Sequence, residues 1–394
     1  MKKMRLAYFS PLPPAHTGIA DYSGQLLPEL AKLAAVTLFT PTAAPLPAAL
    51  AHLPHHPIAE YPQRRWGFDV PLYQMGNSDH HRASYQLALR FPGVVVLHDY
   101  SLHHLITAVM AGTGDYTSYI RTMGYAQGPA GVETAVLIPL HMAEHPLFSE
   151  PLNQRLLDSS WGVIVHSEYA RAQITAAHPQ LPCLVVPGLD MVGDYVPRPR
   201  RAQLNLPEGA FVVASAGQFA ANKRLDVALR AFAQLRAAVP HAHYLLIGEI
   251  MPEANLPALL AELQLEGAVT ALGRIETAAE FADWLATADV LVNLRHPTIG
   301  ETSAVALQGM ALGLPVLVFD HGWYGELPAE AAVKLPVMDG AALTRALHEL
   351  AGDVGRRQAI GRAAQAYTRA HCHPAAVAAA YANFLAQIWE RLVS

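Results

Sequence analysis

Four stretches of the sequence place glycine, cationic and small polar residues at the ends of short apolar runs. They are residues 13–20, 94–99, 214–224 and 293–316. A helical pattern follows in three of them, and the first turn of a helix has unbonded backbone N–H groups that favour an anion. Loops of this kind suit a ligand that carries phosphate and hydroxyl groups.

The third stretch contains the clearest cationic pair, Lys223-Arg224, between the loop glycine Gly217 and a helical pattern that begins at Leu225. Two cations at the start of a helix are unfavourable by themselves, because the helix dipole is already positive there. A bound diphosphate reverses that cost. The spacing of this loop differs from that of a P-loop or a dinucleotide fingerprint, which argues against an ATPase or an NAD enzyme.

The fourth stretch carries the strongest combination, Glu301-Thr302-Ser303-Ala304, at the start of a helix. The backbone N–H groups of Thr302, Ser303 and Ala304 are able to hold an anionic or hydroxyl-rich ligand. Glu301 is able to accept hydrogen bonds from sugar hydroxyls. Threonine and serine are also ordinary helix caps, and capping is compatible with ligand binding here.

The first two stretches give weaker signals. His16 and Gly18 stand in a loop before a helix, where Gly18 permits close approach of a ligand, although a simple turn explains this glycine equally well. His98 and Asp99 end a buried strand, at the edge where open α/β sheets bind ligands. A neutral His98 can hydrogen-bond a sugar hydroxyl, and the alternative is a structural histidine beside a capping Asp99.

Short apolar strands alternate with helical stretches along the chain, which predicts an α/β fold with parallel, doubly wound sheets. Each half of the chain contains about five such strands, enough for a sheet of its own. We therefore expect two Rossmann-like domains that face each other across a cleft, with the ligand between them. The expected strands are Arg5–Phe9, Val36–Phe39, Val94–Leu97, Gly162–Val165, Leu184–Val186, Phe211–Ala216, Tyr244–Ile247, Val269–Leu272, Val290–Leu294 and Pro315–Phe319.

A proline-rich interruption separates the two halves. Residues 188–207 show no clear periodicity, and their prolines exclude a central strand or a helix interior. We therefore predict an N-terminal domain at 1–187, a linker at 188–207 and a C-terminal domain at 208–374. A final helix at 375–394 is expected to pack back on the N-terminal domain, with one face formed by Tyr381, Phe384, Ile388 and Trp389.

Composition excludes several classes of protein. The 394 residues are 52% hydrophobic and 15% charged, which suits buried cores and argues against disorder. A net charge of −5 argues against a nucleic-acid binder. Cys183 and Cys372 are the only cysteines, so we expect neither a disulfide framework nor a cysteine-based zinc site, and a reducing cytosol is the natural compartment.

The apolar run at residues 6–9 is too short for a secretory signal, and no apolar stretch reaches the roughly 18 residues of a membrane span. A cytoplasmic protein is expected. Peripheral contact with the inner face of the membrane stays open as a second location.

The order of these motifs resembles the GT4 family of retaining glycosyltransferases. The resemblance covers essentially the whole chain and is most specific from residue 217 to residue 328. It implies the GT-B fold, with a nucleotide-diphosphate-sugar donor bound mainly to the C-terminal domain. Besides Lys223 and the Glu301 segment, it is carried by Leu246-Ile247-Gly248-Glu249, Leu272-Gly273-Arg274, Ala288-Asp289-Val290-Leu291-Val292, Gly313-Leu314-Pro315-Val316 and Asp320-His321-Gly322-Trp323.

The resemblance implies a role for each matching position. Lys223 resembles the lysine that binds the diphosphate, His98 the histidine that touches the transferred sugar, and Gly18 the glycine near the donor phosphates. Arg274 and Ile275 fall where the family contacts the nucleobase. The expected site is then His98, Lys223 and Glu301 for catalysis, Gly18, Gly217, Arg224, Arg274, Ile275, Thr302, Ser303, Ala304 and Gln308 for the donor, and His16 and Asp99 on the acceptor side.

Two departures from the family pattern matter. Of the family's two glutamates separated by seven residues, the second is replaced by Gln308 and the first by Gly300, with Glu301 one residue later. Gln218 stands where the family has an arginine. Glutamine can still hydrogen-bond ribose hydroxyls, although without the help of a charge.

The activity implied is transfer of a sugar to a glycan, a lipid-linked acceptor or a small molecule, as in polysaccharide biosynthesis. Front-side attack would retain the configuration and would need no metal, cofactor or protein nucleophile. Three alternatives stay open: a nucleotide-sugar epimerase, a phosphorylase, and a catalytically weakened relative that binds a nucleotide-sugar or a partner transferase without turnover.

Overall fold

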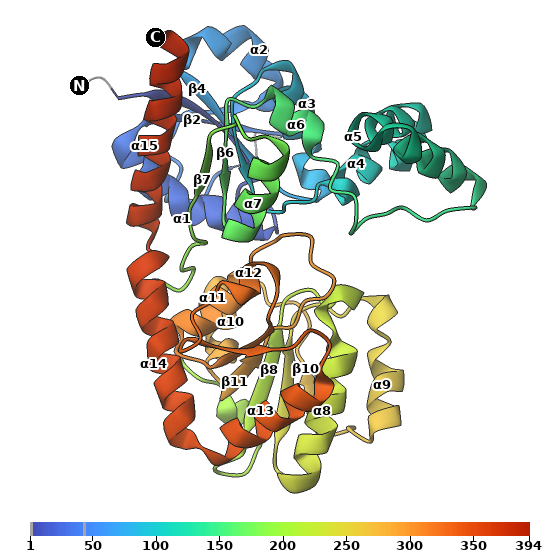
Figure 1. Cartoon of the computed structure of the whole chain (residues 1–394). Helices are drawn as coiled ribbons and strands as arrows, with labels where there is room; N and C mark the ends of the chain where they lie inside the picture. The colour runs from blue at the N-terminus through green and yellow to red at the C-terminus, as the bar shows by residue number, and fades with distance from the viewer. Residues whose placement is uncertain (1–2, 42–44) are drawn as a thin grey trace. The chain divides into compact units, whose positions relative to one another are not determined.

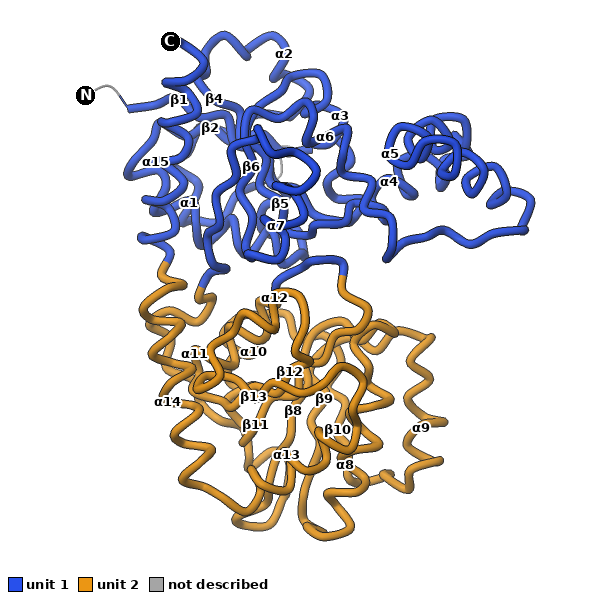
Figure 2. The backbone as a smooth tube through the Cα atoms, viewed as in Figure 1, with its two compact units in different colours: residues 1–189, 299–302, 374–394 blue, residues 190–298, 303–373 orange. Residues whose placement is uncertain are grey.

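The computed structural model describes residues 3–41 and 45–394, which form two compact units (Figure 2). The first unit contains the chain up to Leu189 together with residues 299–302 and 374–394. The second contains residues 190–298 and 303–373. Each unit has a parallel sheet and an apolar core of its own.

The first unit is built on a seven-stranded sheet in which every neighbouring pair of strands is parallel (Figure 1). Side chains of the central strands are buried on both faces, as a sheet covered by helices on both sides requires. In spatial order the strands are β3 (His55–Pro57), β2 (Ala35–Thr40), β1 (Arg5–Phe9), β4 (Val70–Met75), β5 (Val94–Leu97), β6 (Gly162–Val165) and β7 (Cys183–Val185).

Helices connect these strands, and one of them, α5, is kinked at Gly128, whose backbone angles are not helical. Tyr119 and Met123 of α5 pack into the core of the first unit. The helices of this unit are α1 (Gly18–Leu33), α2 (Tyr61–Arg64), α3 (Arg82–Arg90), α4 (His103–Val109), α5 (Tyr116–Leu137), α6 (Gln154–Ser159), α7 (Glu168–Ala177) and α15 (Pro374–Val393).

The second unit repeats this plan with six parallel strands. In spatial order they are β10 (Val269–Ala271), β9 (His243–Ile247), β8 (Val212–Ala216), β11 (Val290–Val292), β12 (Val316–Phe319) and β13 (Ala332–Leu335). Its helices are α8 (Leu225–Ala238), α9 (Leu256–Leu263), α10 (Ala278–Leu285), α11 (Ala304–Ala311), α12 (Gly322–Gly325), α13 (Gly340–Gly352) and α14 (Val354–His371). This strand order is that of the Rossmann fold, so the α/β prediction is confirmed for both units.

The ten expected strands are all present, with ends within two residues of their predicted positions. The prediction omits β3, β4 and β13. β4 lies in the centre of its sheet although it contains Pro71, a residue that usually excludes such a position because it donates no hydrogen bond. Gly93 makes room for the ring, since a Cβ there would lie 2.6 Å from Pro71 Cγ.

Helix α15 packs beside α1 within the first unit (Figure 1). The hydroxyl groups of Tyr381 on α15 and Tyr22 on α1 are 2.8 Å apart and share a hydrogen bond. On β6, Gly162 leaves space for α15, because a Cβ there would lie 2.9 Å from Ile388 Cδ1. The last helix of the chain is therefore part of the core that surrounds the first sheet.

The segment expected to be a linker is held by α10. Asp283 on α10 accepts hydrogen bonds from the backbone N–H of Arg198, at 2.7 Å, and from the hydroxyl of Tyr195, at 2.8 Å. Residues 190–207 belong to the second unit, and their only helical turn is a 3₁₀ turn at 201–204. The prolines keep this segment irregular, as expected, while its polar groups bind it to the second unit.

Candidate functional site

Lys223 and the first turn of α11 meet at one glycine of the second unit. Gly217 follows β8 directly and has a φ of 101°, a conformation that favours glycine. A Cβ at Gly217 would lie 2.5 Å from Lys223 Nζ and 3.6 Å from Val305 Cγ2. Lys223 Nζ also donates a hydrogen bond to the carbonyl oxygen of Ala216, at 3.1 Å. The ammonium group thus lies at the carboxyl end of β8, beside the start of α11.

Helix α11 presents unbonded amides at this point. The hydroxyl of Ser303 caps the helix by accepting a hydrogen bond from Ala306 N, at 3.1 Å, and Leu307 N donates to Ser303 O. The N–H groups of Ala304 and Val305 precede Leu307 N, the first backbone donor within the helix, so they have no acceptor in the helix itself. No acidic residue lies in this first turn. A cation and a helix N-terminus therefore adjoin, an arrangement that suits a phosphate.

A further cation, Arg295, lies near the same strands. The sequence pattern alone assigned no role to this residue. Its Nη1 lies 3.5 Å from Asn222 Oδ1, and its Nε lies 3.4 Å from the hydroxyl of Tyr324. Asn222 follows β8 and Tyr324 follows β12, and β11 lies between those two strands. Arg295 itself follows β11. The guanidinium group therefore lies over the carboxyl ends of three central strands. The position of Arg295 directly after a predicted strand is the feature of the sequence that could have marked it as a candidate.

Arg224, the second cation expected at the diphosphate, is bound to a carboxylate. Its guanidinium donates two hydrogen bonds to Asp226, at 2.7 and 3.1 Å, and its backbone begins α8 with a φ of 51°. A phosphate would have to compete with Asp226 for this side chain.

The remaining residues expected at the donor, and Gln218, which replaces the family's arginine, lie on loops of the second unit or on α11. Arg274 is exposed and lies 3.6 Å from Glu276, and Ile275 packs against the core. Gln308 is half-buried on α11, and the amide of the exposed Gln218 lies 3.4 Å from Glu249. Their roles as contacts to a base, a ribose or a diphosphate stay predictions.

In the first unit, His98 stands among buried polar side chains at the carboxyl end of the sheet. Its Nε2 lies 2.7 Å from Gln74 Oε1, and its ring packs 4.8 Å from Tyr22 and 4.7 Å from His166. Burial holds the pKa of His98 well below its ordinary value, and His166 and His81 lower it further. His98 was selected because it follows a predicted strand, and His166 meets the same criterion because it follows β6. Gln74 lies inside β4, where the sequence gives no indication of a role.

The Glu301 segment packs against the loop that follows His98. Ser101 N donates a hydrogen bond to Ile299 O, at 2.9 Å, and Glu301 Oε2 accepts one from Ile299 N, at 2.8 Å. Gly300 has a φ of 78° and contacts Tyr100 so closely that a side chain would collide with it. Glu301 is buried, and residues 299–302 belong to the first unit, including Thr302 of the expected anion-binding turn. The structure thus brings Glu301 and the His98 loop together.

The loop before α1 is open. Thr17 caps the helix by accepting a hydrogen bond from Ala20 N, and Gly18 is its first residue. His16 and Gly18 are exposed. Asp99, the other residue expected on the acceptor side, accepts a hydrogen bond from Asn77 N at 2.8 Å and so fixes the loop after β4.

The described residues include no group of three or more His, Cys, Asp or Glu side chains placed to hold a metal ion. In the same ranges, no helix combines the length and the apolar composition that crossing a bilayer demands.

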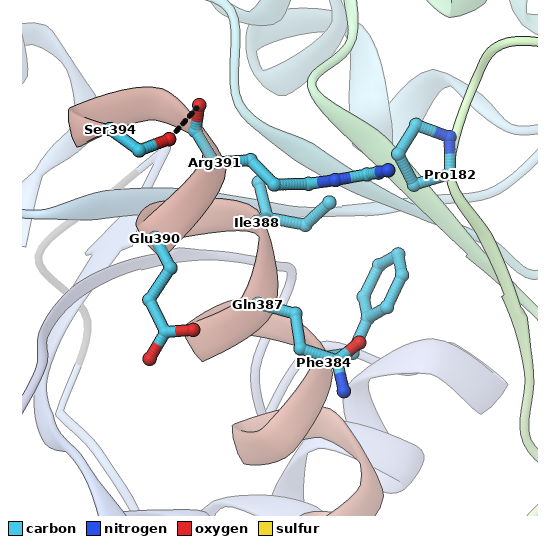
Figure 3. A pocket seen from close by; sticks show the side chains of 7 residues that line it. All are labelled: Pro182, Phe384, Gln387, Ile388, Glu390, Arg391 and Ser394. Carbon is cyan, nitrogen blue, oxygen red and sulfur yellow. Dashed lines mark hydrogen bonds between the residues drawn. The ribbon is translucent and has the colours of Figure 1, made fainter.

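A pocket lies along the last turns of α15, near the amino ends of the strands of the first sheet, whereas His98 lies near their carboxyl ends. Figure 3 shows Phe384 and Ile388 beside Pro182, which precedes β7. His98 follows the carboxyl end of β5, whereas this pocket lies at the amino end of β7. Because parallel sheets bind ligands at their carboxyl edge, the pocket is not part of the candidate site. Its lining is Pro182, Phe384, Gln387, Ile388, Glu390, Arg391 and Ser394.

Three buried histidines of the first unit predict a loss of stability in mild acid. Burial lowers the pKa of His81, His103 and His166 to about 4. Because the ordinary pKa is near 6.5, the unfolded chain binds more protons between pH 6.5 and 4. Each histidine then lowers the free energy of unfolding by about 1.4 kcal/mol per pH unit in that window, and the loss levels off below pH 4.

Urea unfolding at several pH values between 7 and 4 measures this effect. Replacing any one of the three histidines with glutamine should flatten the pH dependence. A free energy of unfolding that stays constant down to pH 4.5 would contradict the prediction.

Comparison with known proteins finds a family match for most of the second unit. Residues 210–353, which contain Gly217, Lys223 and α11, match the family described as glycosyl transferases group 1. This segment is therefore similar to the group 1 glycosyltransferases. The D-inositol 3-phosphate glycosyltransferases of Thermobispora bispora and a Nocardioides species are 33% identical over 157 residues and 34% identical over 153 residues. The matches cover 37% and 34% of this chain, and 36% and 32% of those relatives, about a third of their length.

Solved structures of glycosyltransferases resemble nearly the whole chain. Anabaena HepE in complex with UDP-glucose has a TM-score of 0.69 at 16% identity, covering 99% of both chains. Sucrose-phosphate synthase from Thermosynechococcus elongatus has a TM-score of 0.67 at 19% identity, covering 99% of this chain and 100% of the other. At these identities the likeness concerns the fold alone, and the expected GT-B fold is confirmed.

Proposed function

We propose that this protein transfers a sugar from a nucleotide-diphosphate-sugar donor to a hydroxyl group of a glycan, a lipid-linked acceptor or a small molecule. The observation that carries the proposal is that Lys223 and the first turn of α11 both lie beside Gly217, within the segment that matches the group 1 glycosyltransferases. A cation beside unbonded helix amides is suited to a diphosphate leaving group.

In the proposed reaction, an acceptor hydroxyl attacks C1 of the sugar while the bond from C1 to the diphosphate oxygen breaks. The hydroxyl proton passes to an oxygen of the leaving phosphate on the same face, so the configuration at C1 is retained. Lys223 and the amides of Ala304 and Val305 stabilise the charge that develops on the diphosphate. His98 and Glu301 contact hydroxyl groups of the sugar, and no metal ion takes part.

Donor hydrolysis tests the proposed function directly. The full chain is incubated with UDP-glucose and with a panel of other UDP- and GDP-sugars, with and without EDTA, and release of the nucleoside diphosphate is measured. We expect slow hydrolysis of at least one donor, unchanged by EDTA. Binding without turnover, with every donor and acceptor tried, would favour the catalytically weakened relative. Gln218 and Gln308 are the departures from the family pattern that suggest this alternative. An isomerised nucleotide-sugar as product would favour the epimerase.

Gly18→Ala separates a role in donor binding from a role in the turn. Gly18 is exposed, and a Cβ there would have no heavy atom within 4 Å. The fold therefore tolerates alanine, but a methyl group would block a phosphate that approaches this backbone. We expect an increase of about tenfold or more in the donor KM, equivalent to about 1.4 kcal/mol, with an unchanged melting temperature.

Gly67→Ala is the matched control, because a Cβ at Gly67 also has no neighbour within 4 Å. It should change neither the donor KM nor the melting temperature. An unchanged KM for Gly18→Ala would assign Gly18 to the turn alone.

A further inference from the structure

We propose that Gln74 is a positioning residue that fixes the tautomer of His98, so that His98 presents Nδ1 to its ligand as a hydrogen-bond acceptor. Gln74 lies on β4, and neither the sequence pattern nor the proposed function assigns it a role. The inference rests on the proposed function for its kinetic consequence, but the tautomer can be measured without any turnover.

The hydrogen bond between the two side chains determines which nitrogen carries the proton. The distance from His98 Nε2 to Gln74 Oε1 is 2.7 Å. An amide oxygen only accepts, so Nε2 is the donor and carries the proton. Burial keeps the pKa of His98 well below its ordinary value, so the ring is neutral and has a single N–H. Nδ1 therefore carries the lone pair.

The backbone around Gln74 is held in place by its neighbours. Gln74 is completely buried on a strand between β1 and β5. The backbone carbonyl oxygen of Gln74 accepts a hydrogen bond from His81 Nδ1, at 3.0 Å. Next to it, Met75 O accepts one from His98 N, at 2.9 Å. The backbones of both residues are thus fixed. The buried Gln74 Nε2 has no hydrogen-bond partner among the described residues, so the contact with His98 is the one that orients the amide.

Rings on α1 and after β6 restrict the His98 ring further. Tyr22 packs its ring against His98 at an interplanar angle of 80°, and the hydroxyl of Tyr381 on α15 holds Tyr22 in place. His166 packs nearby and donates from Nδ1 to Val186 O, at 3.0 Å. His98 stays partly exposed, and within the described ranges Nδ1 has no hydrogen bond. Nδ1 is therefore the nitrogen that meets a ligand hydroxyl.

The ligand class follows from this protonation state. A neutral ring with a lone pair at Nδ1 accepts a hydrogen bond from an O–H group and offers no proton to a phosphate or a carbonyl oxygen. His98 thus selects a hydroxyl of the donor sugar or of the acceptor. The other tautomer would present an N–H and reverse that selection.

Two substitutions at Gln74 test the proposal, with Tyr8→Phe as the control. Gln74→Glu keeps an acceptor for Nε2–H, whereas Gln74→Met removes it. Tyr8→Phe removes another buried hydrogen bond of the same unit, from Tyr8 to Ser23 at 2.9 Å, which does not involve His98. The first readout is the nitrogen NMR spectrum of ¹⁵N-histidine-labelled protein, with the His98 signal assigned by its loss in His98→Gln. The second is donor hydrolysis as a function of pH.

We expect the His98 signal of the wild type to show a protonated Nε2 and an unprotonated Nδ1. Gln74→Glu should preserve that pattern and raise the pKa of His98, because a carboxylate favours the charged ring. As the pH is lowered, hydrolysis by this variant should therefore begin to decline at a higher pH than hydrolysis by the wild type. Gln74→Met should give a mixture of tautomers and a kcat lowered about tenfold or more, with the donor KM changed less than threefold. Tyr8→Phe should lower stability alone.

The proposal is overturned if the wild type has its proton on Nδ1, or if Gln74→Met leaves the tautomer or kcat unchanged. If Gln74→Met does not fold, Gln74→Glu decides: an acid limb identical to that of the wild type overturns the proposal. A wild type that shows the expected tautomer and hydrolyses no donor would contradict the proposed function and leave the role of Gln74 in fixing the tautomer standing.

Discussion

Replacing Lys223 with methionine is expected to lower kcat for sugar transfer by about 10²–10³-fold, the usual effect of removing one group that stabilises a developing negative charge. Methionine keeps most of the apolar stem, so the substitution removes the charge and the hydrogen bond from Nζ to Ala216 O. The second of these costs about 1 kcal/mol of stability. Steady-state hydrolysis of the donor measures the kinetic effect, and thermal unfolding measures the structural one.

Lys334→Met is the matched control in the same unit. Lys334 Nζ donates to a backbone carbonyl, Gly325 O at 3.0 Å, much as Lys223 donates to Ala216 O. Both substitutions should therefore lower stability by a similar amount, and only the one at Lys223 should lower kcat. A kcat within threefold of the wild type in Lys223→Met would remove this lysine from the mechanism.

The second large effect is expected for Glu301→Gln, with a loss in kcat/KM of about 10–100-fold. A hydrogen bond to a charged group contributes about 1.5–3 kcal/mol, and the amide accepts from a sugar hydroxyl more weakly than the carboxylate does. Glutamine still offers an oxygen to Ile299 N, so the segment that packs on Tyr100 should stay in place. Kinetics with the donor identified by hydrolysis measure the loss.

Glu280→Gln serves as the control for Glu301. Glu280 pairs with Arg200 at 3.2 Å in the second unit and has no role in the candidate site. Its kcat/KM should stay within twofold of the wild type. If kcat/KM of Glu301→Gln also stays within twofold of the wild type, the Glu301 carboxylate does not contact the sugar. Glu301, one residue later than the family's glutamate, would then not perform that glutamate's role.

The sheets of both units were largely predictable, because runs such as Val94–Leu97 and Gly162–Val165 are continuously apolar. β4 was not, because Pro71 is unusual in a central strand and is accommodated by Gly93, which comes from another part of the chain. The segment 188–207 was predicted to be irregular, but its attachment to Asp283 depends on side chains from a distant helix.

The sequence points to candidate residues where a polar side chain follows a predicted strand. Lys223, His98 and Glu301 were selected in this way and their roles stay predictions, whereas Arg295 and His166 also follow strands and were given no role. Gln74 could not be found in this way, because a buried polar residue inside a strand gains meaning only from the side chain that it contacts. The pairing of Arg224 with Asp226 was equally hidden, since a sequence does not show which of two charges a guanidinium meets.

A crystal structure of the full chain with UDP or GDP, whichever binds more tightly, tests the central claim most directly. We expect diphosphate oxygens at hydrogen-bonding distance, about 2.7–3.2 Å, from Lys223 Nζ and from the N–H of Ala304 or Val305. A nucleotide whose diphosphate lies away from Gly217 and touches neither group would contradict the account.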